Sequence, residues 1–269
     1  MGAELTGALS GFASTTFSHG GTTRDVYRIG DGPAVIVIAE LPGITPKVAD
    51  FARKVAAIGC TAVLPRLFGT AGRAPTGAYT MTSFLPACVS REFAAFATRR
   101  TSPVTSWLRA LAAQAHLDCG GPGVGAVGMC FTGGFALAMM VDEVVLAPVL
   151  SQPSLPLPVN AARRRSVGLS DADLARVKQR CADEEDLCVL GLRFTGDRFV
   201  PAERFARLRQ ELGDSFIGVE LDSSPGNPHG HPRSAHSVLT EHLDDREGTP
   251  TRAALDQVLD LFRSRLLPG

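Results

Sequence analysis

The sequence lacks an excess of charge of either sign. It has 27 Lys plus Arg and 27 Asp plus Glu, so its formal net charge is zero. Because nucleic acids and anionic membranes favour a basic surface, we expect neither as a partner. Long apolar runs are also absent, since none approaches the roughly 18 residues that a membrane-spanning helix needs. The first 14 residues contain neither the basic region nor the long apolar region of a signal peptide. We therefore expect no signal peptide and a cytoplasmic protein.

Cysteine pairs with the spacing of a metal-binding motif are absent as well. None of the six cysteines forms a CxxC motif, and no histidine cluster completes Cys181 and Cys188 as zinc ligands. We therefore expect no metal site, and most of these thiols should be small buried apolar residues in a reducing compartment. The six are Cys60, Cys88, Cys119, Cys130, Cys181 and Cys188.

Strand patterns that alternate with helix patterns run through the chain, without an internal repeat or a clear linker. This alternation predicts an α/β protein with a mostly parallel sheet and helices on both faces, and we expect one domain over residues 1–269. A 45% hydrophobic content agrees with a globular core. The expected strands are 23–27, 34–39, 61–64, 123–127, 144–148, 188–194 and 216–221. The expected helices are 47–58, 86–98, 102–115, one ending near 141, 170–178, 201–212 and 251–266.

One stretch, VGAVGMCFTGGFALAMM (124–140), places a cysteine where a strand turns into a helix. A sharp turn of this kind needs small neighbours because other backbone passes close to it. Gly128 lies two residues before Cys130 and Thr132 two residues after it, which is close to the pattern of a nucleophile elbow. A helix N-terminus also favours the thiolate form of a cysteine. The pattern indicates a nucleophile, although a small core thiol at a turn is the alternative.

A cysteine nucleophile needs a base and an acid that orients the base. In proteins with this elbow, the chain order is nucleophile, acid, histidine. Asp197 comes directly after a predicted strand and is the candidate acid, although a simple turn residue is the alternative. The base should follow the next strand, where the sequence PGNPHGHPRSAHSV offers His229, His231 and His236. The composition of this loop does not choose among the three.

A nucleophile that attacks a carbonyl also needs hydrogen-bond donors for the oxyanion that forms. The N–H of Phe131, directly after the cysteine, is the first expected donor. The loop after an earlier strand should supply the second, and we assign it to the N–H of Leu41.

Several of these segments resemble the dienelactone hydrolase family, which are α/β-hydrolases with cysteine in place of the usual serine. GMCFTGG matches, with one shift, the elbow of that family, and ELPG (40–43) matches its first loop. TGDRFVP (195–201) resembles the acid loop and AHSVL (235–239) the base motif, while ADFARKVAAIGCTAVLPRLFG (49–69) resembles a helix and strand of the family. The resemblance covers about residues 34–262.

The resemblance implies the α/β-hydrolase fold and hydrolysis of an ester or lactone, with thioesters also feasible. It implies Cys130 as nucleophile, Asp197 as orienting acid and His236 as base, ahead of His231 and then His229. Glu40 would contact the thiol and govern its ionisation, although an ordinary loop carboxylate is the alternative. No metal or organic cofactor is implied, the substrate would be a small molecule, and the protein would be a monomer or homodimer.

Three departures from the family pattern bear on the substrate and the elbow. Thr132 replaces a glycine and is expected to affect the tightness of the turn. Val238 replaces a phenylalanine, and Thr240 stands where the family enzyme has an arginine for a substrate carboxylate. Such an arginine would have to come from elsewhere, and the candidates are Arg66, Arg73 and Arg91.

A second class of function also fits the sequence. The chain could keep the hydrolase fold without catalysis and act in ligand binding or in redox sensing through Cys130.

Overall fold

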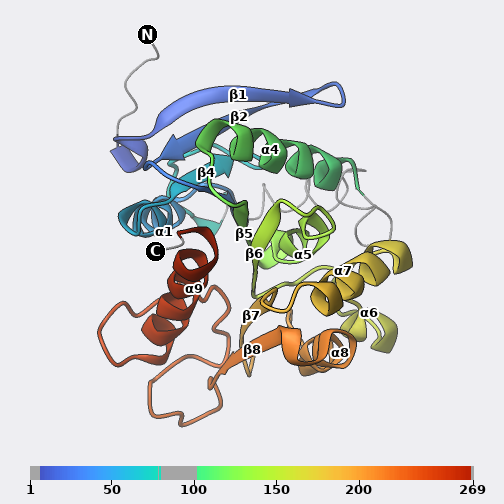
Figure 1. Cartoon of the computed structure of the whole chain (residues 1–269). Coiled ribbons are helices and arrows are strands. Elements are labelled where there is room, and N and C mark those ends of the chain that lie inside the picture. Colours follow the sequence, from blue (N-terminus) through green and yellow to red (C-terminus); the bar gives the residue numbers. More distant parts are fainter. Residues whose placement is uncertain (1–6, 78, 80–101, 268–269) are drawn as a thin grey trace.

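An eight-stranded sheet forms the centre of the molecule (Figure 1). The computed structural model describes residues 7–77, 79 and 102–267. The strand order is β1-β2-β4-β3-β5-β6-β7-β8. The first two pairs in this order are antiparallel, and the remaining pairs are parallel. The predicted α/β fold with a mostly parallel sheet is confirmed.

The central strands are short, apolar and fully buried, as expected of a parallel sheet that is covered on both faces. β3 reads AVIVI and β4 reads TAVLP, and every residue of both is buried. The strands are β1 (Ala13–His19), β2 (Thr22–Ile29), β3 (Ala34–Ile38), β4 (Thr61–Pro65), β5 (Val124–Met129), β6 (Val145–Ser151), β7 (Val189–Phe194) and β8 (Phe216–Leu221).

The helices begin at recognisable caps. Thr45, Ser102 and Thr249 each accept a hydrogen bond from a backbone N–H of the first turn, and a proline follows each of them. The predicted N-cap Ser170 is confirmed by its bond from the Asp173 N–H. The helices are α1 (Pro46–Ala57), α4 (Pro103–Cys119), α5 (Phe135–Met139), α6 (Ala161–Arg165), α7 (Asp171–Asp183), α8 (Ala202–Leu212) and α9 (Pro250–Leu266), and the 3₁₀ turns are η1 (Gly7–Leu9), η2 (Cys130–Thr132) and η3 (Gly213–Ser215).

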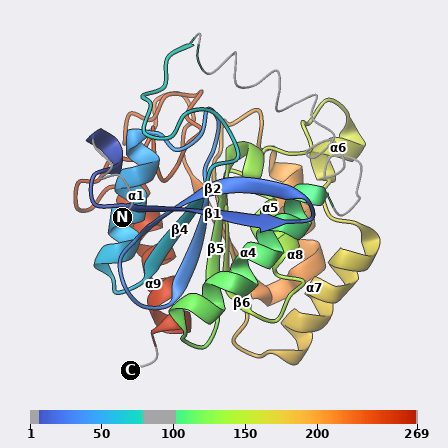
Figure 2. The same ribbon diagram turned by 90° about the horizontal axis from the view of Figure 1, so that it is seen from above.

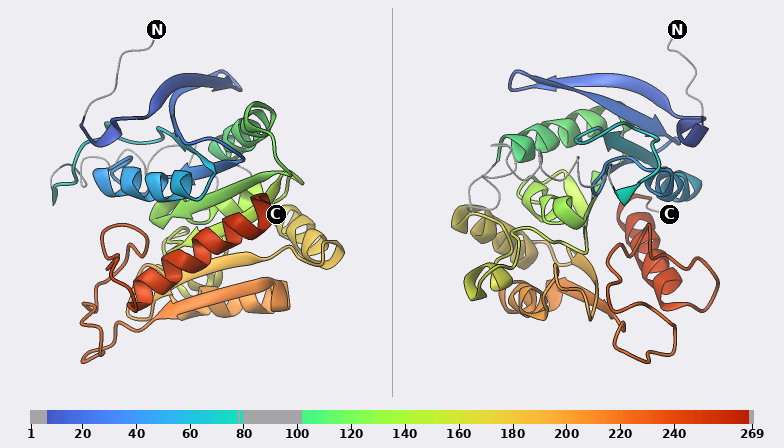
Figure 3. Two further views of the ribbon diagram at one scale, coloured as in Figure 1. Left: turned by 60° about the vertical axis from the view of Figure 1, so that its left-hand side comes forward. Right: turned by 180° about the vertical axis from the view of Figure 1, so that it is seen from behind.

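Helices cover both faces of the sheet, as the view from above shows (Figure 2). α1 and α9 lie on one face, where Phe51 and Phe262 pack with Val35 and Val37. α4, α5, α7 and α8 lie on the other face, where the alternate residues of β3 point. Figure 3 shows α9 crossing the strands that it covers. Each central strand therefore contributes to two apolar clusters at once.

The sheet register decides which loops meet. β3 and β5 are parallel neighbours with Ile38 opposite Gly128, so Glu40 and Cys130 each lie two residues past a paired position. β3 also pairs with β4 on its other side, and the direction of chain progression reverses there. Open α/β sheets bind ligands at this kind of position, outside the carboxyl ends of the strands.

Two short elements were not predicted from the sequence, and one predicted helix lies outside the described residues. The hairpin strand β1 was not predicted, because its residues ASTTFSH are mostly polar and exposed and lack apolar alternation. α6 was also missed, since it has one turn and no buried residue. The helix predicted at 86–98 falls outside the described residues. In the described part of the chain, no helix combines the length and apolar character that crossing a membrane requires.

Candidate active site

The strand-to-helix turn after β5 has the geometry of a nucleophile elbow. Cys130 has a φ of 54°, a left-handed conformation that residues other than glycine rarely adopt. Glycine is required two residues earlier, because a Cβ at Gly128 would lie 2.2 Å from the carbonyl oxygen of Thr132. It is required again at Gly133, where a Cβ would lie 2.5 Å from Cα of Pro153. The turn thus presents a partly exposed thiol at the carboxyl end of the sheet.

Thr132 stabilises this turn. Its buried hydroxyl accepts the N–H of Met129 at 3.0 Å and donates to the carbonyl oxygen of Ile38 at 2.7 Å. The side chain therefore joins the end of β5 to the end of β3. Where the family pattern has glycine, this chain has a polar link between the two strands that carry Cys130 and Glu40.

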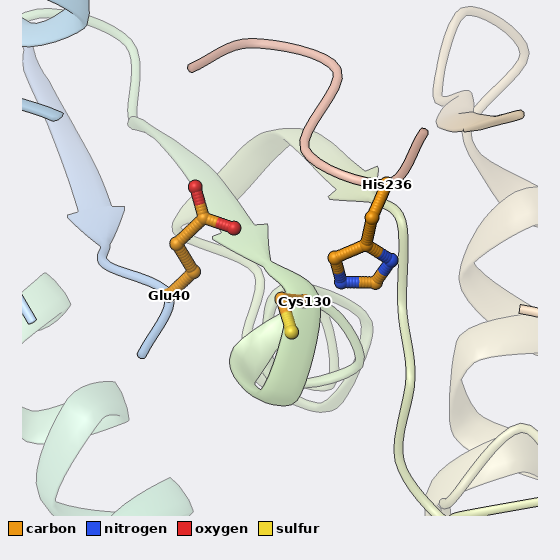
Figure 4. Close-up of side chains that lie close together, drawn as sticks. All are labelled: Glu40, Cys130 and His236. Atoms are coloured by element: carbon orange, nitrogen blue, oxygen red, sulfur yellow. The ribbon is translucent and has the colours of Figure 1, made fainter. Parts of the chain in front are cut away.

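His236 lies beside Cys130, with Asp197 next to it. His236 Nδ1 and Asp197 Oδ2 are 2.6 Å apart, and the Asp197 side chain is 2% exposed. The other side of the His236 ring faces the Cys130 sulfur (Figure 4), and a ring nitrogen and the sulfur lie within 4.8 Å of each other. Three residues from the loops after β5, β7 and β8 thus lie in a row, with His236 between Asp197 and Cys130.

The pKa of His236 reflects these neighbours. Burial favours the neutral ring and lowers the pKa, but the negative charge of Cys130 and the hydrogen bond and charge of Asp197 raise it more. The net pKa of His236 is well above its usual value. The imidazolium form of His236 is therefore favoured at this position.

Glu40 approaches Cys130 from the side opposite His236 (Figure 4). Its carboxylate is 5% exposed and accepts three neutral donors. Thr240 Oγ1 donates to Oε1, Ser237 Oγ donates to Oε2 at 2.6 Å, and Gln152 Nε2 donates to Oε2 at 3.3 Å. The threonine that stands in place of an arginine therefore holds Glu40 in position.

Three further residues belong to the site and were missed in the sequence. The Ser154 hydroxyl lies 3.6 Å from the Cys130 sulfur and is 3% exposed. Gln152, at a positive φ of 37°, accepts the N–H of Val238 while it donates to Glu40. His242 Nδ1 accepts the N–H of Ser237 at 3.2 Å and that of His236 at 3.4 Å. The sequence SQPS (151–154), shortly after the strand predicted at 144–148, was the one available signal for Gln152 and Ser154.

Comparison with models of known protein families shows which family the chain belongs to. The model of the dienelactone hydrolase family matches residues 24–266. The chain belongs to the dienelactone hydrolase family. Membership of this family makes the protein a carboxylic ester hydrolase that acts on small molecules, and it confirms the resemblance seen in the sequence. No curated protein matches the chain by sequence.

Solved structures of dienelactone hydrolases and their relatives share the fold. One from Klebsiella pneumoniae, described as a dienelactone hydrolase, has 17% identity and a TM-score of 0.62 and covers 93% of this chain and 97% of its own. A dienelactone hydrolase-like promiscuous phosphotriesterase from metagenomic libraries has 19% identity, a TM-score of 0.61 and coverages of 95% and 98%. A cold-adapted esterase from an Arctic intertidal metagenomic library has 14% identity, a TM-score of 0.55 and coverages of 94% and 92%. At these identities the likeness concerns the fold.

The other candidates of the sequence have different surroundings in this dienelactone hydrolase fold. The His231 ring meets the Phe194 ring, with the centroids 5.1 Å apart, and burial followed by the charge of His229 lowers its pKa. Arg66 pairs with Asp25 at 2.8 Å.

Two further arginines were candidates for binding a substrate carboxylate, and two backbone N–H groups were candidates for binding the oxyanion. The Arg73 guanidinium stacks 4.1 Å from the centroid of the Tyr79 ring, and Arg91 lies outside the described residues. The N–H groups of Phe131 and Leu41 stay predictions as oxyanion donors.

One group of side chains could hold a metal ion. Glu40, Cys130 and His236 each offer one ligand atom, and these atoms lie within 4.8 Å of one another. Thiolate, imidazole and carboxylate together are a donor set that suits zinc. A metal bound there would occupy the same thiolate and the same ring nitrogen that hydrolysis would use.

Proposed function

We propose that the protein hydrolyses esters or lactones, and also thioesters, through a Cys130–His236–Asp197 triad and a covalent acyl-enzyme. One observation carries the proposal: Asp197 bonds to His236, and His236 lies against the thiol at a strained elbow. Glu40, anchored by three donors, would lie against the thiol and influence its ionisation.

The first half of the reaction forms the acyl-enzyme. The Cys130 thiolate attacks the carbonyl carbon, and the carbonyl oxygen becomes an oxyanion that the N–H groups of Phe131 and Leu41 stabilise. The bond to the leaving oxygen or sulfur then breaks, and the protonated His236 gives that atom its proton. An alcohol or thiol leaves, and the acyl group remains on the sulfur as a thioester.

The second half regenerates the enzyme. His236, now neutral, takes a proton from a water molecule that attacks the thioester carbonyl. The tetrahedral intermediate breaks down to a carboxylic acid and the Cys130 thiolate, with His236 again protonated. Asp197 orients the ring through Nδ1 in both halves of the reaction.

The test uses p-nitrophenyl acetate and simple lactones with the wild-type protein, Cys130→Ala and Cys119→Ala. We expect Cys130→Ala to lose hydrolysis and the acetylated-protein mass seen after rapid quenching, while Cys119→Ala keeps both. Cys119 is a suitable control because it is also a partly exposed free thiol. Equal rates for the wild type and Cys130→Ala would refute the triad, and oxidation of Cys130 without turnover would favour the redox-sensing alternative.

The identity of the base has its own test. We expect His236→Ala to lower kcat by at least about 10²-fold, in the range of general acid–base catalysis, and His231→Ala to change it little. The reverse order would assign the base to His231. The cytoplasmic location and the monomeric or homodimeric state stay predictions.

A further inference from the structure

A cavity of about 320 Å³ lies directly beside Asp197. Two neighbouring loops form it: residues 196–199 follow β7, and residues 233–234 follow β8, which pairs with β7. The two loops are closely packed, because a Cβ at Gly196 would lie 2.8 Å from the carbonyl oxygen of Arg233. The lining residues are Gly196, Asp197, Arg198, Phe199, Arg233 and Ser234.

This cavity adjoins the proposed acid–base pair. The Phe199 ring meets the His236 ring edge to face, with centroids 5.8 Å apart and planes at 72°. The N–H of Phe199 donates to Asp197 Oδ1 at 2.9 Å, while Asp197 Oδ2 bonds to His236. The Phe199 side chain is 55% exposed. It thus offers an apolar surface between His236 and the cavity.

Positive charge predominates around the cavity. Arg198 and Arg233 are exposed, and neither has a hydrogen bond or an ion pair with another described residue. The charge of Asp197 is balanced by His236. Behind it, the buried Arg204 interacts with Asp197 electrostatically but gives its hydrogen bonds to four backbone carbonyls. The guanidinium groups therefore outnumber the carboxylates that face them.

We propose that this cavity is a subsite for an anionic group on the leaving alcohol or thiol of the substrate. The inference rests on the proposed function, because it takes His236 as the group that protonates the leaving atom. That atom must then lie at His236, and the rest of the leaving group extends past Phe199. Arg198 and Arg233 would bind a carboxylate or phosphate at its far end. The substrate class is an ester or thioester of an alcohol or thiol that bears an anionic group beyond an apolar segment.

Matched substrates test the subsite. 4-Acetoxybenzoate and 4-acetoxybenzamide differ in the charge at the far end of the leaving group, and 4-acetoxyphenyl phosphate separates phosphate from carboxylate recognition. We expect the wild type to favour an anionic substrate over the amide in kcat/KM. Arg198→Gln and Arg233→Gln should each reduce that preference about fivefold, the upper end for a solvent-exposed ion pair. Arg165→Gln, an exposed arginine on α6 outside the cavity, should reduce nothing.

A substrate with its charge on the acyl group serves as the control. Monophenyl succinate carries its charge on the acyl group, so its kcat/KM should not respond to the two arginine substitutions. The subsite would be overturned if the arginine substitutions changed kcat/KM for monophenyl succinate. It would also be overturned if neither substitution changed the preference of the wild type for the anionic substrates over the amide. If the wild type hydrolyses none of these esters, including the neutral amide, the proposed function itself fails. Competitive inhibition by 4-hydroxybenzoate, weakened in both variants, is a second readout that does not depend on turnover of the charged ester.

Discussion

At the scale of single residues, the site depends on one strained cysteine. A non-glycine residue at a φ of 54° costs about 1–3 kcal/mol and persists only where its surroundings hold it. Here the hydroxyl of Thr132 joins β5 to β3, and the Ser154 N–H donates to the Cys130 carbonyl oxygen at 2.9 Å. These bonds hold the elbow from both sides, so the threonine in place of glycine is compatible with a tight turn.

Ser154 is predicted to assist the thiolate. Its buried hydroxyl lies 3.6 Å from the sulfur and can donate a hydrogen bond to the negative charge. Hydrogen bonds to charged groups contribute about 1.5–3 kcal/mol, so Ser154→Ala should lower kcat/KM for p-nitrophenyl acetate about tenfold. The free energy of unfolding should change little, which denaturant unfolding of the same variant checks. An unchanged kcat/KM would remove Ser154 from the site.

Asp197 is predicted to set the alkaline limit of activity. The protonated His236 must supply a proton, so the rate falls where this ring loses its charge, at a pH well above its usual pKa. Burial lowers the pKa of His236, and Asp197→Asn removes a hydrogen bond and a charge that raise it. The basic limb of the pH profile of kcat/KM should therefore move to lower pH, with the maximum rate reduced about 10²-fold. A basic limb at the same pH in this variant would contradict the assignment.

At the scale of elements, loops that follow neighbouring parallel strands carry the site, and buried side chains fix those loops. Arg204 on α8 is the main example, since it is 1% exposed and donates to the carbonyl oxygens of Pro153, Pro156, Arg163 and Ser166. Burial lowers its pKa to about 10, and the charge of Asp197 opposes this effect. The loop that carries Ser154 is thus attached to the helix that follows the acid loop.

Arg204→Met is predicted to destabilise the protein by about 3 kcal/mol, because several buried carbonyl groups lose their donors. Arg204→Lys should recover part of this loss, since an ammonium group can reach some of the same oxygens. Denaturant midpoints at constant m-value give the comparison. If both variants match the wild type, the contacts of Arg204 do not hold this loop.

His242 is predicted to position the loop of the base. Its Nδ1 accepts two backbone N–H groups, those of His236 and Ser237, which requires an unprotonated nitrogen. Burial, followed by the charge of His236, lowers the pKa of His242 and favours this neutral form. His242→Leu should lower kcat about tenfold, the equivalent of about 1.4 kcal/mol, whereas His242→Asn offers an amide oxygen and should retain most activity. Equal rates in the two variants would argue against the acceptor role.

At the scale of the whole molecule, the sheet connects the two apolar clusters. The strands contribute alternate residues to each face, and Trp107, the single tryptophan, is 2% exposed in the cluster opposite α9. If residues 1–269 form one domain, both clusters should unfold together.

We therefore predict that the midpoints from Trp107 fluorescence and from far-UV circular dichroism coincide. Phe262→Ala, on the other face, should shift the Trp107 transition along with the rest, with a loss of about 3–5 kcal/mol. Leu117→Ala is the control, because Leu117 is 78% exposed and should change neither transition. A Trp107 transition that Phe262→Ala leaves in place would indicate two separately folding parts.

The sequence alone determined the central strands and the main helices, because buried β-branched runs, hydroxyl caps and glycine stops are local signals. A few consecutive residues were enough to predict a buried strand from AVIVIA, a sharp turn from GMCFTGG and an acid loop from the Gly-Asp after β7. The polar strand β1 could not, since exposed residues such as those of ASTTFSH carry no pattern that distinguishes strand from loop.

The tertiary structure decided which of these signals meet. The proposal of His236 over His231 as the base rests on side-chain direction in a long polar loop, where one ring faces Cys130 and the other packs on Phe194. The roles of Ser154, Gln152 and His242 likewise depend on contacts between loops that follow different strands. No local pattern encodes such contacts, because the register of the parallel sheet, set by the packing of the whole core, brings these loops to one edge.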